Sequence, residues 1–156
     1  MTKCYRNADE REINLNILNK EEIKKIIPHR DPFLFVDEIT DYIPGEFAKG
    51  LKHVSEDEYY FKGHFPGNPI MPGVIIIETL AQVGAIMMLT LEKFKGKLVL
   101  FAGIDKVRFK KVVKPGDTLD LEVKVTNVRL NVGKGIGTAK VNGEVVCIAE
   151  ILFSIV

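Results

Sequence analysis

A histidine and a glutamate lie on either side of a proline- and glycine-rich stretch in the middle of this 156-residue chain. His64 opens the segment HFPGNPIMPG, and Glu78 is the single acid in the apolar run VIIIETLAQVGAIMMLTL that follows. Each proline limits its own φ and the residue before it, so the backbone behind His64 has few accessible conformations. A rigid backbone beside a titratable side chain is what a positioned catalytic base requires. We interpret His64 as a candidate base, and a tight turn with an incidental histidine is the structural alternative.

The acid at position 78 has the sequence context of a proton donor. Desolvation by apolar neighbours favours the neutral form of a carboxyl group. Gln82 lies four residues further along, on the same helical face, where its amide can hydrogen-bond the carboxyl group and orient it. The alternative is a carboxylate in a buried structural ion pair. No Lys or Arg occurs between Val74 and Leu91, so such a partner would have to come from elsewhere in the chain.

The start of the helix that this apolar run predicts is a third candidate group. Pro72 has no N–H, so Gly73 supplies the first free amide, and its missing side chain would let a ligand oxygen approach. Free amides and the helix dipole stabilise negative charge, as at the carbonyl of a thioester. A base, an acid and such an amide suit removal of a proton next to a carbonyl while a leaving hydroxyl is protonated. The apolar residues of 74–91 could accommodate an alkyl chain.

The other two histidines have less specific surroundings. His29 follows Pro28 at the end of a predicted helix, where a structural role in capping the last carbonyls is favoured over a functional one. His53 stands in the alternating pattern of a predicted strand, which favours a surface or sheet position. Neither histidine is assigned to the candidate site.

Composition is typical of a soluble globular domain, with 46% hydrophobic and 28% charged residues. A net charge of +1 gives no argument for binding to nucleic acid or to an anionic membrane, and near-neutral charge favours self-association.

Cys4 and Cys147 have no zinc-ligand spacing and form no disulfide framework, which indicates a reducing, cytoplasmic setting. The polar N-terminus has no apolar core of a secretory signal. The 18 residues of 74–91 just reach the length of a membrane span, but Glu78 and Gln82 interrupt them, so we expect no membrane span.

The chain divides into two strands, one long helix and about four further strands. A short helix is predicted between the N-cap Asn19 and Pro28, and the helix after the proline-rich loop (63–73) is predicted over about 72–93. Strict alternation of apolar and polar residues in TLDLEVKVTNVRL indicates a half-buried strand, and Asn142-Gly143 indicates a type I′ hairpin. The predicted strands cover residues 33–40, 46–55, 98–109, 118–130, 133–141 and 144–156.

These elements predict one α+β domain. Half-buried strands need cover on one face, and the helix at 72–93 is the one element long and apolar enough to supply it. We therefore predict a curved antiparallel sheet wrapped around one central helix. Residues 15–156 are predicted to form this single domain, and the polar residues 1–14 a flexible N-terminal arm.

Three segments resemble a known enzyme family. PHRDPFLFVDEI (28–39), GHFPGNPIMPGVIIIETLAQ (63–82) and FAGIDKVRFKKVVKPGD (101–117) are similar to the β-hydroxyacyl-[acyl-carrier-protein] dehydratases of bacterial-type fatty acid synthesis. The block 63–82 is the most specific, because the histidine, both Pro-Gly pairs, the glutamate and the glutamine all fall at the family's spacing. The resemblance covers roughly residues 17–156.

The resemblance implies a hot-dog fold and a lyase that converts (3R)-hydroxyacyl chains to trans-2-enoyl chains without a metal or dissociable cofactor. It implies His64 and Glu78 as catalytic residues and Gly73, Phe65 and Gln82 as substrate-binding residues. It also implies a homodimer, often three dimers in a hexamer, in which each active site takes His64 from one subunit and Glu78 from the other.

The implied protein partner is acyl carrier protein, which carries the substrate on its phosphopantetheine arm. Acyl carrier protein is acidic, so a basic patch near the site would steer it. Arg108, Lys110 and Lys111 in KVRFKKVVK are candidates, and an ordinary solvated strand face explains them equally well.

Three related activities compete with the plain dehydratase. A dehydratase that also isomerises the double bond typically has Asp at the acid position, whereas this chain has Glu78. A hot-dog thioesterase generally lacks the HFPGNPIMPG loop. A non-catalytic acyl-thioester-binding protein of the same fold would have no use for an intact His64 and Glu78.

Overall fold

The computed structural model describes residues 16–156. The predicted flexible arm, residues 1–14, and Cys4 lie outside the described residues. Six strands form one sheet in the order β1-β2-β4-β5-β6-β3, and every neighbouring pair is antiparallel. The strands are β1 (Glu38–Ile43), β2 (Phe47–His53), β3 (Val99–Phe109), β4 (Thr118–Arg129), β5 (Val132–Val141) and β6 (Glu144–Ile155).

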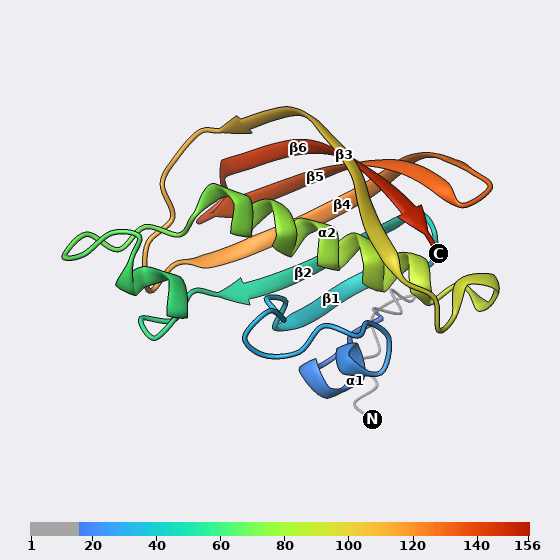
Figure 1. Cartoon of the computed structure of the whole chain (residues 1–156), viewed down its shortest axis with the longest axis horizontal. Helices are drawn as coiled ribbons and strands as arrows, with labels where there is room; N and C mark the ends of the chain where they lie inside the picture. The colour runs from blue at the N-terminus through green and yellow to red at the C-terminus, as the bar shows by residue number, and fades with distance from the viewer. Residues whose placement is uncertain (1–15) are drawn as a thin grey trace, which may run out of the picture.

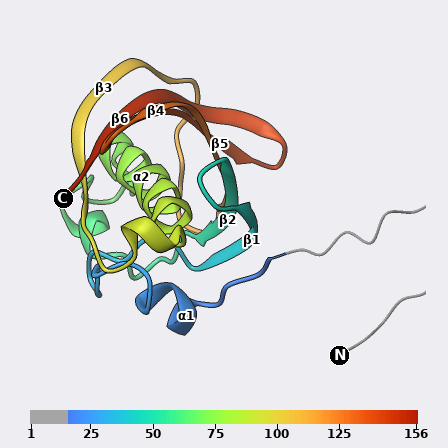
Figure 2. The same cartoon turned by 90° about the vertical axis from the view of Figure 1, so that its right-hand side faces the viewer.

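The sheet curves around a single long helix, α2 (Gly73–Leu89), as Figures 1 and 2 show. Eleven of the helix's residues are buried, which agrees with a sequence that is apolar almost all round. Glycine in β5 lets the helix approach the sheet closely, because a Cβ on Gly137 would lie 3.1 Å from a methyl group of Leu80. The predicted α+β fold, a curved sheet around one central helix, is confirmed.

The strands after the helix follow the predicted pattern closely. Leu119, Leu121 and Val123 of β4 are buried, and the acids between them face outward or are partly exposed. The hairpin between β5 and β6 has positive φ at both Asn142 and Gly143, as a type I′ turn requires. Local alternation and turn chemistry therefore suffice to place these strands.

The N-terminal elements differ more from the prediction. The helix α1 (Lys20–Lys24) begins after Asn19, whose side chain accepts from the Glu22 amide while the Glu22 carboxylate accepts from the Asn19 amide. This capping box confirms the predicted start. The helix ends at Lys24, however, and the long helix α2 ends at Leu89, four residues before its predicted end, with the short 3₁₀ turn η2 (Glu92–Phe94) after it.

The first predicted strand, residues 33–40, is wrong over its first half, because β1 begins only at Glu38. The backbones of Phe33 and Phe35 bond the side chain of Gln82 and not a neighbouring strand. Residues 34–36 are therefore buried without belonging to the sheet.

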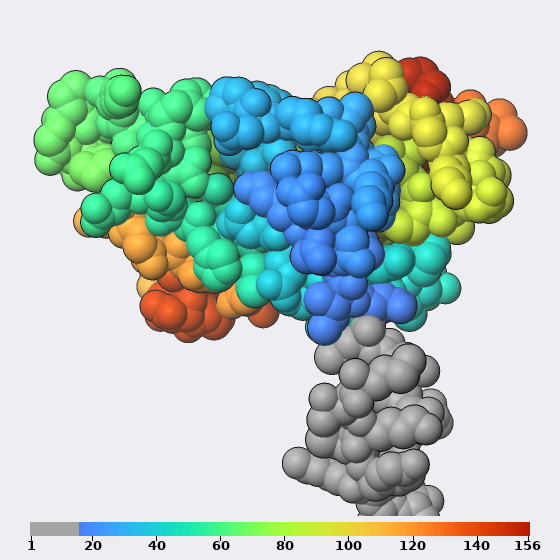
Figure 3. Space-filling view, turned by 90° about the horizontal axis from the view of Figure 1, so that it is seen from below, coloured from blue at the N-terminus to red at the C-terminus, as the bar shows by residue number. Residues whose placement is uncertain are grey.

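The sheet leaves one side of α2 open, and the N-terminal segment closes it. Figure 2 shows α1 and the chain after it below the helix, and Figure 3 shows this segment in blue between the loop before α2 and the region of η2. The 3₁₀ turn η1 (Tyr59–Lys62) leads into that loop. Within residues 16–156, no helix combines the length and apolarity needed to cross a membrane.

Candidate active site

His64 is held by the backbone of its own loop. Its Nδ1 lies 2.7 Å from the carbonyl oxygen of Ile70, so Nδ1–H donates to that oxygen. The neutral ring then has its lone pair on Nε2, which is the form that a general base needs. Backbone bonds from the His64 amide to the Tyr60 carbonyl and from the Ile70 amide to the His64 carbonyl hold both ends of the loop.

A tight turn inside the loop confirms the predicted rigidity. The Phe65 and Asn68 amides each donate to the other residue's carbonyl, at 3.1 and 2.9 Å. Pro66 and Gly67 occupy the two central positions, and Gly67 has a φ of +73°, which is typical of a type II turn. Phe65, assigned to substrate binding from the sequence, is 48% exposed and stacks on the His64 ring with a centroid distance of 4.0 Å.

Gly73 begins α2 directly after Pro72, as predicted. Among the hydrogen bonds of residues 16–156, none uses the Gly73 amide as a donor, so this N–H is available to a ligand. The space that a side chain would occupy is already filled, because a Cβ on Gly73 would lie 2.6 Å from Cε1 of Phe109. Glycine is therefore required here by packing against Phe109, a contact that the sequence did not predict.

Glu78 lies one and a half turns into α2 and is oriented by Gln82, as predicted. Gln82 Nε2 donates to Glu78 Oε1 over 3.2 Å, and the Glu78 side chain is 18% exposed. Gln82 itself is fixed by two further bonds, from its Nε2 to the Phe33 carbonyl at 2.8 Å and from the Phe35 amide to its Oε1 at 2.9 Å. The orientation of the carboxyl group thus depends on the segment that closes the open side of the helix.

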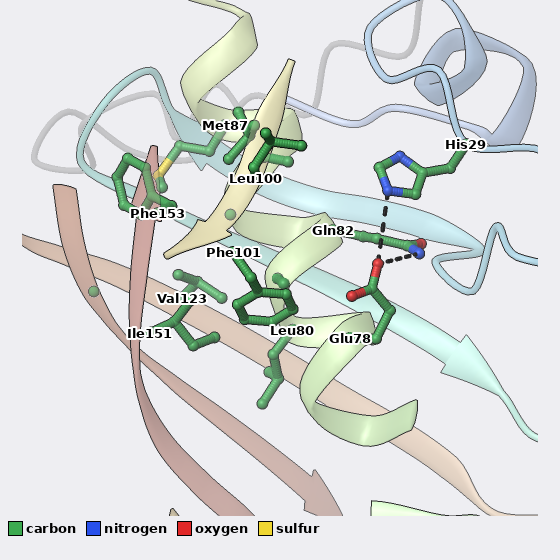
Figure 4. A pocket seen from close by; sticks show the side chains of 15 residues that line it. His29, Glu78, Leu80, Gln82, Met87, Leu100, Phe101, Val123, Ile151 and Phe153 are labelled. Carbon is green, nitrogen blue, oxygen red and sulfur yellow. Dashed lines mark hydrogen bonds and ion pairs between the residues drawn. The ribbon is translucent and has the colours of Figure 1, made fainter. Parts of the chain in front are cut away.

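His29 belongs to the same site, which corrects its assignment as a helix cap. Its Nε2 lies 3.6 Å from Glu78 Oε1, and Figure 4 shows its ring directed at the carboxyl group. Arg30 caps the helix end instead, because its guanidinium donates to the carbonyls of Lys24 and Ile27. The sequence contained no local signal for the contact of His29 with Glu78, because 49 residues separate the two.

A narrow apolar cavity of about 50 Å³ begins beside these two side chains. It lies between α2, β3 and the inner face of the sheet (Figure 4). Glu78 and His29 are its only ionisable lining residues within the described chain. The others include Leu80, Met87, Leu100, Phe101, Val123, Ile151 and Phe153. Apolar walls with a few polar groups at one end are typical of a site for an alkyl chain.

His64 does not line this cavity, and within residues 16–156 no hydrogen bond or ion pair joins it to Glu78. One chain therefore holds the fixed His64 ring and the oriented Glu78 carboxyl group without a direct contact between them.

The FabA-like domain family matches residues 27–150, most of the chain. The chain belongs to this family. It is 55% identical over 139 residues to a Bacillus velezensis protein named 3-hydroxyacyl-[acyl-carrier-protein] dehydratase FabZ, with 89% of this chain and 99% of that protein covered. A protein of the same name from Caldicellulosiruptor bescii is 56% identical over 137 residues, with 88% and 98% covered. The family identified from the three sequence segments is confirmed.

Solved structures show the same fold at low sequence identity. The dehydratase heterocomplex ApeI:P from Xenorhabdus doucetiae has a TM-score of 0.74 at 18% identity, covering 85% of this chain and 89% of that one. A hypothetical thioesterase from Streptococcus pneumoniae, solved with coenzyme A, has a TM-score of 0.58 at 13% identity, covering 76% and 84%. Since a dehydratase and a thioesterase share it, the fold does not choose between the two reactions.

The three basic residues considered for partner binding lie at and after the end of β3 and are all exposed. Lys111 forms an ion pair with Glu144, whereas Arg108 donates to the Val107 carbonyl and makes no ion pair within the described residues. Lys110 likewise has no acidic partner in residues 16–156. Of these three positive charges, those of Arg108 and Lys110 are therefore not neutralised by a neighbouring acid among residues 16–156.

Cys147, the one cysteine among the described residues, is buried in β6. Burial raises the pKa of its thiol to about 11, because the thiolate would be desolvated. The thiol is therefore protonated at neutral pH and does not supply a nucleophile.

Proposed function

We propose that this protein dehydrates (3R)-hydroxyacyl-[acyl-carrier-protein] to trans-2-enoyl-[acyl-carrier-protein] during fatty acid elongation. The proposal is supported by relatives of 55–56% identity that are named 3-hydroxyacyl-[acyl-carrier-protein] dehydratase FabZ. It is also supported by a histidine whose Nε2 is free, by a glutamate oriented by Gln82, and by an apolar cavity beside that glutamate.

In the proposed reaction, Nε2 of His64 removes a proton from C2 of the acyl chain. The C2–H electrons form the C2=C3 double bond as the C3–O bond breaks, and Glu78 protonates the departing oxygen, so that water leaves. The Gly73 amide donates to the thioester oxygen, on which negative charge develops while C2 loses its proton. No metal or other cofactor takes part in this sequence of steps.

The observation that carries the mechanism is the hydrogen bond from His64 Nδ1 to the Ile70 carbonyl. It selects the tautomer in which Nε2 is free to accept a proton, and it does so before any substrate binds. The same bond would stabilise the imidazolium that forms when the proton arrives, because both ring nitrogens are then donors.

We extend the proposal to a homodimer in which His64 of one subunit and Glu78 of the other share a substrate. The edge strand β3 supports this, because its unpaired side presents exposed apolar residues. Leu100, Phe101, Ile104 and Phe109 are each 41–52% exposed, which is unusual for a sheet edge that faces water. Association of three dimers into a hexamer rests on the family resemblance alone.

Acyl carrier protein is the proposed donor of the substrate, and Arg108, Lys110 and Lys111 are the proposed contacts with it. The two charges without an acidic neighbour, Arg108 and Lys110, would contribute most to steering. A cytoplasmic location is part of the proposal and is consistent with an unpaired buried thiol at Cys147.

The test is incubation of the purified protein with 3-hydroxybutyryl- and 3-hydroxydecanoyl-[acyl-carrier-protein]. We expect absorbance of the trans-2-enoyl thioester to appear with both substrates. Release of free thiol would indicate a thioesterase, and a cis-3-enoyl product from the ten-carbon substrate would indicate the isomerising dehydratase. Binding without turnover would indicate an acyl-thioester-binding protein, and each of these three outcomes contradicts the proposal.

A further inference from the structure

His29 reaches the candidate acid from the segment that closes the open side of α2. Its Nε2 lies 3.6 Å from Glu78 Oε1, and the two side chains are 22% and 18% exposed. This separation is within ion-pair distance but longer than a hydrogen bond. Catalytic hydrogen bonds are often long in unliganded sites and shorten when substrate binds. Both side chains line the polar end of the same cavity, whose other walls are apolar.

The two oxygens of the Glu78 carboxyl group have different surroundings. Oε1 accepts from Gln82 Nε2 at 3.2 Å and also faces His29. Figure 4 shows the other oxygen, Oε2, directed away from both side chains toward the part of the cavity that Phe101 lines. An oxygen that already faces two donors is a poor position for an acidic proton, so the proton of a neutral carboxyl group belongs on Oε2.

The protonation state of His29 is limited by its second ring nitrogen. Nδ1 is buried and has no hydrogen-bond partner among the described residues. A proton there would leave a buried donor unsatisfied, which is costly. The neutral ring with its proton on Nε2 fits this site, because that proton is directed at an acceptor, Glu78 Oε1. Among residues 16–156, no other ionisable side chain lines the cavity, and Arg30 of the same segment is directed at backbone carbonyls.

We propose that His29 is a positioning residue for the catalytic acid: together with Gln82 it engages Oε1 of Glu78, so that Oε2 carries the transferred proton into the cavity. This inference rests on the proposed dehydratase function, in which Glu78 protonates the leaving hydroxyl. It gives His29 a role in the reaction without contact to the reacting atoms. Loss of the contact would let the carboxyl group rotate and misplace its proton.

The backbone around His29 is built to hold this position. Pro28 precedes it, and the Arg30 guanidinium donates to the carbonyls of Ile27 and of His29 itself, at 3.0 and 2.7 Å. The His29 ring lies nearly parallel to the Phe33 ring, with 12° between the planes and 6.4 Å between the centroids. The backbone carbonyl of Phe33 in turn accepts a hydrogen bond from Gln82 Nε2. His29 and Gln82, the two residues that face Oε1, are therefore held by the same short segment.

The test compares His29→Phe, which removes the donor, with His29→Gln, which keeps an N–H donor. Both variants would be assayed as full-length protein with 3-hydroxybutyryl-[acyl-carrier-protein], with kcat and KM measured separately. We expect His29→Phe to lower kcat about 10- to 100-fold with KM nearly unchanged, a loss typical of residues that orient a reacting group. His29→Gln should lose markedly less. His53→Phe, which removes a histidine from the exposed surface of β2, is the matched control and should behave like the unmodified protein.

The conservative variant separates positioning from a general structural effect. His29→Gln restores an N–H donor at this position and His29→Phe does not, so a positioning role predicts that kcat recovers in part in His29→Gln while KM stays nearly unchanged in both variants.

Two outcomes would overturn the inference while leaving the proposed function intact. One is an active unmodified protein whose His29→Phe variant has the same kcat. The other is a loss of kcat in His29→Phe that His29→Gln does not relieve, which would indicate a structural role. Absence of turnover by the unmodified protein would instead overturn the proposed function, and the inference with it.

Discussion

The base and the acid of the proposed site are held in contrasting ways. His64 is fixed by a carbonyl six residues away, inside one short loop with a tight turn at its centre. Glu78 is oriented by Gln82 and by His29, and both of these depend on the segment before β1. Hydrogen bonds within one short loop thus position the base, whereas contacts between residues far apart in the sequence position the acid. Changes far from the active site should therefore affect the acid before they affect the base.

The largest effect should come from removing either reacting group. His64→Asn and Glu78→Gln should each lower kcat by at least about 10³-fold, since general acid–base groups contribute roughly 10²–10⁴ each and neither replacement transfers a proton at neutral pH. Steady-state kinetics with 3-hydroxybutyryl-[acyl-carrier-protein] measure the loss. Circular dichroism should be unchanged in both variants, because each replacement is polar and no larger than the side chain it replaces.

Co-expression of these two variants tests whether the sites are shared between subunits. A mixed dimer would contain one site with both replacements and one site with none. Each mixed dimer should therefore have about half of the activity of the unmodified dimer. Mixed dimers isolated with two different affinity tags provide the measurement. Failure to recover any activity would contradict a site that combines the loop of one subunit with the helix of the other.

Gln82 bonds both Glu78 and the segment before β1, so its replacement should disturb the surroundings of Glu78 most. Gln82→Leu would leave the buried Phe35 amide and the part-buried Phe33 carbonyl without their partner, at a cost of about 1–3 kcal/mol each. Urea unfolding should therefore show a loss of about 2–6 kcal/mol. Thr79→Val is the control: Thr79 is equally buried in α2 but bonds only the Ile75 carbonyl, and its loss should be below about 1 kcal/mol. Equal losses in the two variants would contradict the bridging role of Gln82.

Gly73 provides the corresponding test on the loop side. Gly73→Ala should lower the free energy of unfolding by about 1–3 kcal/mol, because the new methyl group would overlap the Phe109 ring. Thermal melts of Gly73→Ala and of Gly73→Ala combined with Phe109→Leu measure the effect. The second replacement shortens the opposing side chain and should recover part of the loss. A double variant no more stable than Gly73→Ala would show that the strain has another source.

The smallest expected effect concerns the support of His29. Arg30→Lys keeps the positive charge but loses the planar group that donates to three carbonyls, so we expect a loss of about 1 kcal/mol in unfolding free energy. Because those bonds hold the backbone beside His29, kcat should fall slightly as well. Lys24→Arg, on the neighbouring exposed helix surface, is a control that should change neither quantity.

The contrast between loop and helix also explains what the sequence could predict. The turn behind His64, the helix start at Gly73 and the pairing of Glu78 with Gln82 are all local, and proline, glycine and helical spacing specify them. The contact between His29 and Glu78 spans 49 residues, and no periodicity links the two. The same holds for residues 33–36, which resemble a strand locally but bind the Gln82 side chain. Tertiary partners of an apolar segment decide whether it joins a sheet, and these cannot be derived from the segment alone.

The hydrogen bond between His64 and Ile70 has a consequence for how the loop can vary. It closes the loop from residue 64 to residue 70 at a fixed length, and Pro66 and Gly67 must occupy the two central turn positions within it. One residue more or fewer between 64 and 70 would move either the acceptor or the turn out of register. Substitutions on the exposed surface of the loop should be tolerated, but insertions and deletions should not. Across homologous chains, the number of residues in this loop should therefore vary less than their identity.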